Sequence, residues 1–384
     1  MPLVVFDTII AILVFFLCSK WEKRPNKSLW IIILSVMVLS CGLRYDTASD
    51  YLNYVLLFYR IRDGLNFPFE VEPGYLLLNK LFVSIPYGFT IVLFISSLVS
   101  IYLLMDFLTR NDSLKWGLFF CFCFELIMMF NNQVRQGIAV ATFLYATRFI
   151  QEGKWWKYLI AIIAAMMFHM SALIALMYYP LIKYADKKKP SPVTYFIVGV
   201  CFVIVLISGI MSPLLSGLFE INEHYARFQG TGYQDADSFE SIGPVFVFNL
   251  LIFFYILASR GAFDKKTFVF YNMTFIILVL YCIFGTIPLM ERLVRYLYVY
   301  EYVALAIVVS NKRYYKKKQV VIIRAVMMTC ICVYGLYCSY ANNLGGIYMS
   351  VFSEDCKNHV FYERNGKDGL DSKDRSKVET YNLE

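Results

Sequence analysis

Apolar stretches near or above the length of a membrane span recur along the whole chain, and they constrain its fold more than any other feature. Hydrophobic residues make up 59% of the 384 residues, and the mean hydropathy is +0.58. A helix needs roughly 20 apolar residues to cross a bilayer. The sequence therefore predicts an all-α, polytopic membrane protein.

We interpret about twelve stretches as transmembrane helices, some of them short or broken. They cover residues 3–19, 29–43, 88–108, 116–131, 134–150, 157–169, 170–184, 192–211, 244–259, 268–287, 293–310 and 320–340. The stretch from 157 to 183 would be about 40 Å long as one helix, at 1.5 Å per residue. A break near His169 divides it into two short helices, and such breaks are tolerated where they line a cavity enclosed by protein.

Basic connectors between these stretches indicate the orientation. Six of them, at residues 20–27, 110–115, 148–157, 183–189, 260–266 and 312–318, hold 21 of the 36 Lys and Arg residues. Short loops rich in Lys and Arg stay in the cytoplasm. The net charge of +8 is thus explained by topology, and a nucleic acid partner is not implied. The first stretch lacks an n-region lysine and a small-residue cleavage site, so we expect a retained span with its amino terminus outside.

The remaining connectors then face outside. We expect one transmembrane bundle over residues 1–340, with large outside loops at 44–87 and 212–243, and a polar tail at 341–384. In the first loop, Asp46 can cap a helix that runs to Arg62. Pro73 can open a second helix, at about 74–85, which is too short to span and is interpreted as interfacial or re-entrant.

Cysteine and histidine give no sign of a metal or cofactor. The pairs Cys121 with Cys123 and Cys330 with Cys332 lie in apolar helices, where a spacing of two directs side chains to nearly opposite faces. They are interpreted as core residues. The three histidines are too scattered for a zinc signature, and nucleotide-binding and metalloprotease motifs are absent from the sequence.

Two arginine clusters fall at the outer ends of apolar stretches, where charge is expensive and usually functional. Arg135, flanked by Gln133 and Gln136, opens a helix, and a helix amino terminus with an arginine favours phosphate oxygens. Arg292 stands three residues before Arg295 and four before Tyr296, so all three share a helix face. The alternative is arginines that extend to lipid headgroups.

The first outside loop carries carboxylates and tyrosines, which suit sugars because hydroxyls need acceptors and a pyranose face stacks on a ring. The candidates are Arg44, Asp46, Asp50, Tyr51, Tyr54, Glu72 and Tyr75. The alternative is a capped, solvated helix, with Glu72 simply complementing a helix dipole.

His169, followed by Ser171, lies at the proposed helix break and is the histidine placed to exchange a proton in the outer half of the bundle. A histidine on an apolar helix is also a common core residue. His224, in the 212–243 loop with Arg227, is the reserve candidate.

These residues, in this order and spacing, resemble the EpsG family of Wzy-type oligosaccharide repeat-unit polymerases of capsule, exopolysaccharide and O-antigen synthesis. The resemblance covers roughly residues 1–340. It is carried by Arg44-Tyr45-Asp46 with Asp50-Tyr51 and Tyr54, by Glu72-Pro73-Gly74-Tyr75, by Arg135-Gln136 before a small-residue helix, and by Phe168-His169 with Ser171.

The resemblance implies a fold like that of the GT-C-type lipid-dependent glycosyltransferases, in the bacterial inner membrane. It implies undecaprenyl-pyrophosphate-linked oligosaccharides as substrates, glycosyl transfer as the reaction, no metal, and flippase and chain-length regulator proteins as partners beside the lipid bilayer. The rivals are an O-antigen ligase, a membrane O-acyltransferase, and a flippase or exporter of lipid-linked oligosaccharides.

The residues thus fall into two groups. The candidate catalytic residues are His169, Arg135, Arg292 and Arg295, and the candidate substrate-binding residues are Arg44, Asp46, Asp50, Tyr51, Tyr54, Glu72, Tyr75, Gln133, Gln136, Ser171, Tyr296, His224 and Arg227.

Overall fold

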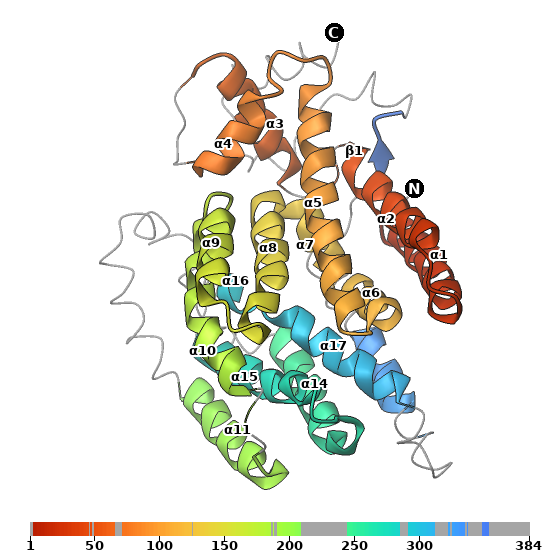
Figure 1. Cartoon of the computed structure of the whole chain (residues 1–384), viewed down its shortest axis with the longest axis vertical. Coiled ribbons are helices and arrows are strands. Elements are labelled where there is room, and N and C mark those ends of the chain that lie inside the picture. The colour runs from red at the N-terminus through yellow and green to blue at the C-terminus, as the bar shows by residue number, and fades with distance from the viewer. Residues whose placement is uncertain are drawn as a thin grey trace.

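The computed structural model is an all-helical bundle with one small two-stranded sheet (Figure 1). It describes residues 3–45, 47, 50–65, 71–124, 126–185, 187, 190–208, 244–284, 291–311, 322, 325–334, 336 and 348–352. The elements are α1 (Leu3–Lys23), α2 (Lys27–Gly42), β1 (Arg44–Tyr45), α3 (Tyr51–Arg62), α4 (Pro73–Lys80), α5 (Gly88–Arg110), α6 (Leu114–Cys123), α7 (Leu126–Asn132), α8 (Val134–Gln151), α9 (Trp155–Met166), η1 (Met170–Ile174), α10 (Ala175–Ala185), α11 (Pro192–Ile207), α14 (Pro244–Ala258), η2 (Arg260–Ala262), α15 (Phe268–Phe284), α16 (Glu291–Val294), α17 (Tyr298–Ser310) and β2 (Met349–Ser350).

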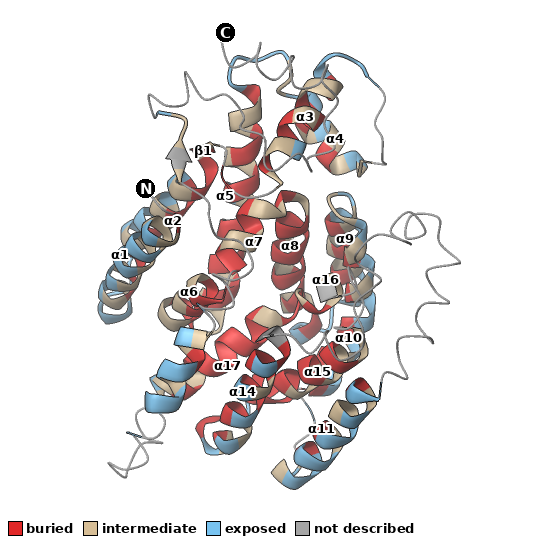
Figure 2. Ribbon diagram, turned by 180° about the vertical axis from the view of Figure 1, so that it is seen from behind, coloured by how far each residue is buried: buried red, intermediate tan, exposed pale blue. Residues whose placement is uncertain are grey.

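Two of the described helices, α1 and α5, are long and apolar enough to cross a membrane. The pair α6 and α7, bent by 62°, forms a third candidate span, and the other apolar helices have 10–17 residues. The expected all-α membrane protein is confirmed at this level. Figure 2 shows that α1 and α11 expose much of their surface. On α1 that surface is apolar, with residues such as Ile9, Ile12 and Phe16 exposed, as suits contact with lipid.

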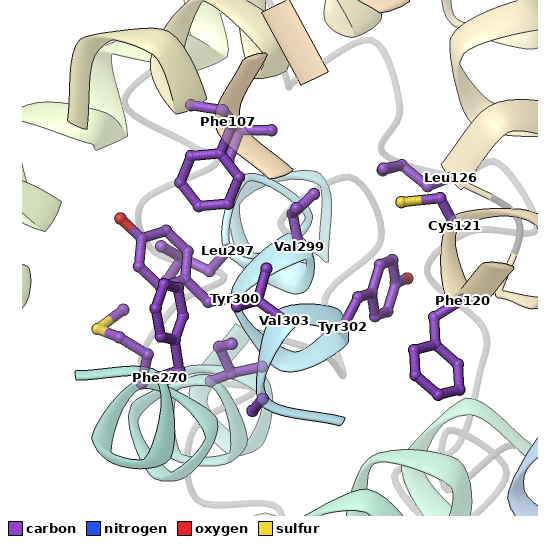
Figure 3. Packing of buried hydrophobic residues seen from close by; sticks show 14 of the residues in the cluster. Phe107, Phe120, Cys121, Leu126, Phe270, Leu297, Val299, Tyr300, Tyr302 and Val303 are labelled. Atoms are coloured by element: carbon purple, nitrogen blue, oxygen red, sulfur yellow. The ribbon is translucent and has the colours of Figure 1, made fainter. Parts of the chain in front are cut away.

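The centre of the bundle is built around α8, α15 and α17, which are mostly buried (Figure 2). Figure 3 shows how α17 is held. Tyr300 packs against Phe107 of α5 and Phe270 of α15, with ring centroids 5.5 Å and 5.4 Å away. Tyr302 lies on the side of α6, near Phe120. This packing fixes the chain just before α17, where Arg295 and Tyr296 stand.

The helices α3 and α4 lie together at one end of the bundle, beyond the ends of α8 and α9 (Figure 1). α3 ends at Arg62 as predicted, but it starts at Tyr51, so the expected start next to Asp46 is wrong. The observed start lies later in the chain than the predicted one, and the residues just before the predicted start differ from a helix: Arg44 and Tyr45 are extended and pair antiparallel with residues 349–350.

Other expectations agree with the elements. The predicted break at His169 is confirmed, because α9 ends at Met166 and η1 begins at Met170. Pro73 opens α4 as predicted, although α4 ends at Lys80 and not near residue 85. The region expected to be a polar tail contributes β2, and Val351 N donates to Leu43 O at 3.0 Å.

Candidate functional site

A single carboxylate, Glu72, joins three parts of the chain. It is the N-cap of α4 and has an extended backbone, yet its side chain makes no capping hydrogen bond. One oxygen, Oε2, accepts from Arg135 Nη1 of α8 at 2.6 Å, and Oε1 lies 3.0 Å from His169 Nδ1. The interpretation of Glu72 as a simple helix-dipole residue is therefore insufficient, since its carboxylate is directed towards α8 and the helix break.

Backbone contacts fix α4 against the end of α9. Gly74 N lies in the first turn of α4, where backbone N–H groups have no partner within the helix, and it donates to Met167 O at 2.8 Å. A Cβ atom at Gly74 would lie 2.7 Å from the same oxygen, so a close approach of this kind requires glycine. Met170 N also points at Glu72 Oε1, at 3.4 Å. The break in the α9–α10 stretch thus holds α4 through both backbone and side chain.

The start of α8 contacts the segment around α16 through two glutamines. Gln133 Oε1 accepts from Arg295 Nη1, and Gln136 Nε2 donates to Arg292 O, each at 2.9 Å. Gln133 directly precedes α8 and Gln136 lies in its first turn, and both are over 150 residues earlier in the chain than their partners. The two arginine clusters expected from the sequence therefore lie against each other.

η1 and α10 contact the chain from α16 to α17. Ser171 Oγ and Tyr296 Oη are 2.9 Å apart, and Tyr178 Oη donates to Leu293 O at 2.7 Å. Tyr296 is completely buried, so its hydroxyl serves this contact. Hydrogen bonds thus join four segments in a closed ring, which consists of α4, α8, the chain from α16 to α17, and η1 with the break before it.

Asp50 lies at the start of α3, beside the same junction. Asp50 N donates to Asn132 Oδ1 at 2.8 Å. Burial raises the pKa of the Asp50 carboxyl, and the positive charges of Arg292 and Arg135 oppose that rise. This dependence places Asp50 within electrostatic reach of both arginine clusters.

Arginines and carboxylates set the electrostatics of this site. Arg135 binds Glu72, and the charges of Arg135 and Arg292 both act on the Asp50 carboxyl. Burial alone would raise the pKa of Glu72, but the hydrogen bond with His169 and the charge of Arg135 outweigh it and lower that pKa to about 2. Half-buried guanidinium groups at a helix amino terminus are suited to phosphate oxygens, and an adjacent imidazole can exchange a proton.

Four other candidates lie in packed surroundings. Arg44 is only 2% exposed and donates to the carbonyls of Cys41 and Asn131, so it ties α2 to α7. The three tyrosines of the first loop, Tyr51, Tyr54 and Tyr75, belong to a small hydrophobic core of α3, α4 and the start of α5. Sugar stacking on these rings would need them to leave that core.

Three candidates, Asp46, His224 and Arg227, lie outside the described residues. The structure adds Asn132 and Tyr178, which the sequence reasoning did not select. Asn132 had a visible signal, since it extends the polar junction next to Gln133. Tyr178 had no such signal in the sequence, because one tyrosine in an aromatic-rich helix is indistinguishable from a core residue.

Across the part of the chain that the structure describes, no three His, Cys, Asp or Glu side chains gather in a group that could hold an ion. The positive charge at the site comes from arginines.

The helices and this polar end, where arginines and carboxylates meet, define an all-helical membrane protein. The model of the EpsG family matches residues 27–350, and the chain belongs to that family. The family is associated with polysaccharide polymerase-like proteins. No curated protein and no solved structure matches the chain.

Proposed function

We propose that this protein joins undecaprenyl-pyrophosphate-linked oligosaccharide repeat units by glycosyl transfer at the outer face of the bacterial inner membrane. The observation that carries the proposal is the convergence of Arg135, Arg292 and Arg295 beside His169 on one hydrogen-bonded set of segments. Family membership supports a role in polysaccharide biosynthesis.

In the proposed reaction, the three arginines bind the pyrophosphate of the donor and stabilise the charge that develops on it as it leaves. The acceptor hydroxyl gives its proton to His169 while its oxygen bonds to the anomeric carbon. The bond from that carbon to the pyrophosphate oxygen breaks, and its electron pair leaves with undecaprenyl pyrophosphate. A general base contributes typically about 10²- to 10⁴-fold in rate.

The same proposal includes about twelve membrane crossings, a GT-C-like architecture and independence from metal ions. Short helices such as α9 and α10 span as parts of a bundle in this view, with the break at His169 near the outer surface. Guanidinium groups take the place that Mg²⁺ occupies in metal-dependent pyrophosphate chemistry.

A direct test uses the purified full chain in lipid nanodiscs with lipid-linked repeat units isolated from a strain that lacks the protein. We expect a ladder of lipid-linked polymers and release of undecaprenyl pyrophosphate, both unchanged by EDTA. Loss of activity in EDTA with recovery in Mg²⁺ would contradict metal independence. Transport of intact lipid-linked units in proteoliposomes, without a ladder, would favour a flippase or exporter.

A further inference from the structure

Glu72 is surrounded by donors. Arg135 Nη1 donates to Oε2, and Met170 N points at Oε1, which also lies 3.0 Å from His169 Nδ1. An ionised carboxylate only accepts hydrogen bonds, and the lowered pKa of Glu72, about 2, keeps it ionised. The contact with His169 is therefore satisfied when Nδ1 carries the hydrogen. In a neutral ring, that arrangement leaves the lone pair on Nε2.

The backbone holds the His169 ring in place for this contact. His169 has extended dihedral angles, with φ −157° and ψ 117°, and it separates α9 from η1. His169 N donates to Ala165 O, and Ala172 N donates to His169 O, both at 3.0 Å. The hydrogen bond from Gly74 N to Met167 O fixes α4, and hence Glu72, next to the break.

On these contacts, and resting on the proposed polymerase reaction, we propose that Glu72 is a positioning residue. It holds His169 in the tautomer with hydrogen on Nδ1, so that Nε2 is the atom that takes the proton of the acceptor hydroxyl. In this role Glu72 contacts neither sugar. The proposal thus replaces the substrate-binding role expected from the sequence. The charged or titratable groups that act on Glu72 are Arg135 from α8 and His169.

The chemistry of the side chain explains why a carboxylate is required. Arg135 has no acceptor, and the proposed His169 tautomer also presents a donor, so position 72 needs two acceptor atoms. Glutamine has one acceptor and one donor group. If its oxygen faces Arg135, its NH₂ faces Nδ1 and favours the other tautomer, with hydrogen on Nε2. If its oxygen faces His169, its NH₂ opposes the donors of Arg135.

The tautomer can be read from nitrogen-15 NMR of the full chain, labelled at histidine and held in lipid nanodiscs. The His169 signals are assigned by their absence in His169→Gln. We expect a protonated Nδ1 and an unprotonated Nε2 in the wild type, and a shift of the hydrogen towards Nε2 in Glu72→Gln. Glu72→Asp, which keeps two acceptors, should retain the wild-type tautomer even if the shorter side chain lowers the rate.

Kinetics with the isolated lipid-linked repeat units supply the second measurement. Glu72→Gln should lower kcat by about 10²- to 10⁴-fold, the range for loss of a correctly oriented base, with a KM for the donor within about threefold of wild type. Asp63→Asn removes another carboxylate of the first outside loop, paired with Arg62 at 3.2 Å, and should change neither kcat nor the spectrum.

The two proposals fail separately. The spectrum needs no turnover, so an inactive wild type contradicts the proposed function alone. A wild-type His169 with its hydrogen on Nε2, or a Glu72→Gln variant with unchanged tautomer and near-normal kcat, overturns the positioning role alone.

Discussion

Among single residues, Glu72 links α4, α8 and the break before η1 through one side chain. Its side chain is 12% exposed, and it binds Arg135 and His169 through different oxygens. Loss of one charge-assisted hydrogen bond typically costs about 1.5–3 kcal/mol, and more when a partly buried charge is left without its partner. Substitutions at this group should therefore affect both chemistry and stability.

Arg135→Lys should lower polymerisation by roughly ten- to a hundredfold, because a compact ammonium cannot reproduce the bidentate contacts of guanidinium with phosphate. The measurement is the rate of undecaprenyl pyrophosphate release at matched protein amounts. Arg62→Lys, at another ion-paired arginine of the outside loop, is the control and should retain activity. A well-folded Arg135→Lys variant with normal polymer would instead indicate an arginine that only contacts lipid headgroups.

The lowered pKa of Glu72 gives a pH dependence of stability. The pKa falls from 4.5 to about 2 on folding, so the stabilisation is fully present above about pH 4.5. It is lost as the pH falls from there towards 2, because in this range the unfolded state binds a proton that the folded carboxylate does not. Thermal unfolding of the wild type and Glu72→Gln in detergent, from pH 7 to pH 3, should show a difference in Tm that shrinks with acid. A constant difference would contradict this linkage.

At the scale of elements, the short helix α4 and the break before η1 act as one unit. The sequence predicted the break from the length of the stretch at 157–183, and it predicted the start of α4 from Pro73. It could not predict that these two features meet, because Glu72 and His169 are 97 residues apart. It also placed the start of α3 too early, since the pairing of residues 44–45 with 349–350 leaves no local signal.

Gly74→Ala tests this unit. The added methyl group would lie 2.7 Å from Met167 O, so α4 must shift away and weaken the bond from Gly74 N. Overpacking of this kind costs typically about 1–3 kcal/mol. We expect a lower Tm and reduced polymerisation, because Glu72 moves with α4.

Gly199→Ala provides the matched control. Its Cβ would lie 3.4 Å from the tip of the Phe253 ring, an ordinary contact, and α11 lies apart from the site. Thermal unfolding of both variants is the measurement, with activity assayed on the same samples. A Gly74→Ala variant as stable and active as Gly199→Ala would show that α4 is not anchored through its first turn.

For the whole molecule, hydropathy predicted the all-helical class because a bilayer leaves the backbone few alternatives. The convergence of the site was partly predictable. Charge asymmetry assigned Gln133, His169 and Arg295 to one side, and hydrogen bonds join Gln133 with Arg295 and place His169 against Glu72. The burial of Tyr54 and Tyr75 was not predictable, since tyrosines spaced along a helix look alike on a core face and on a sugar-binding face.

Topology is testable by cysteine labelling in intact cells, in a variant whose ten native cysteines are replaced. Cysteines at Asp63 and at Phe352 should react with an impermeant maleimide from outside, because Asp63 follows α3 in the first outside loop and Phe352 follows the strand that pairs with residues 44–45. A cysteine at Lys187, in a basic connector, should react after permeabilisation only. Labelling at 187 from outside would make the stretch from α9 to α10 a single crossing, and it would remove His169 from the outer surface where the proposed reaction takes place.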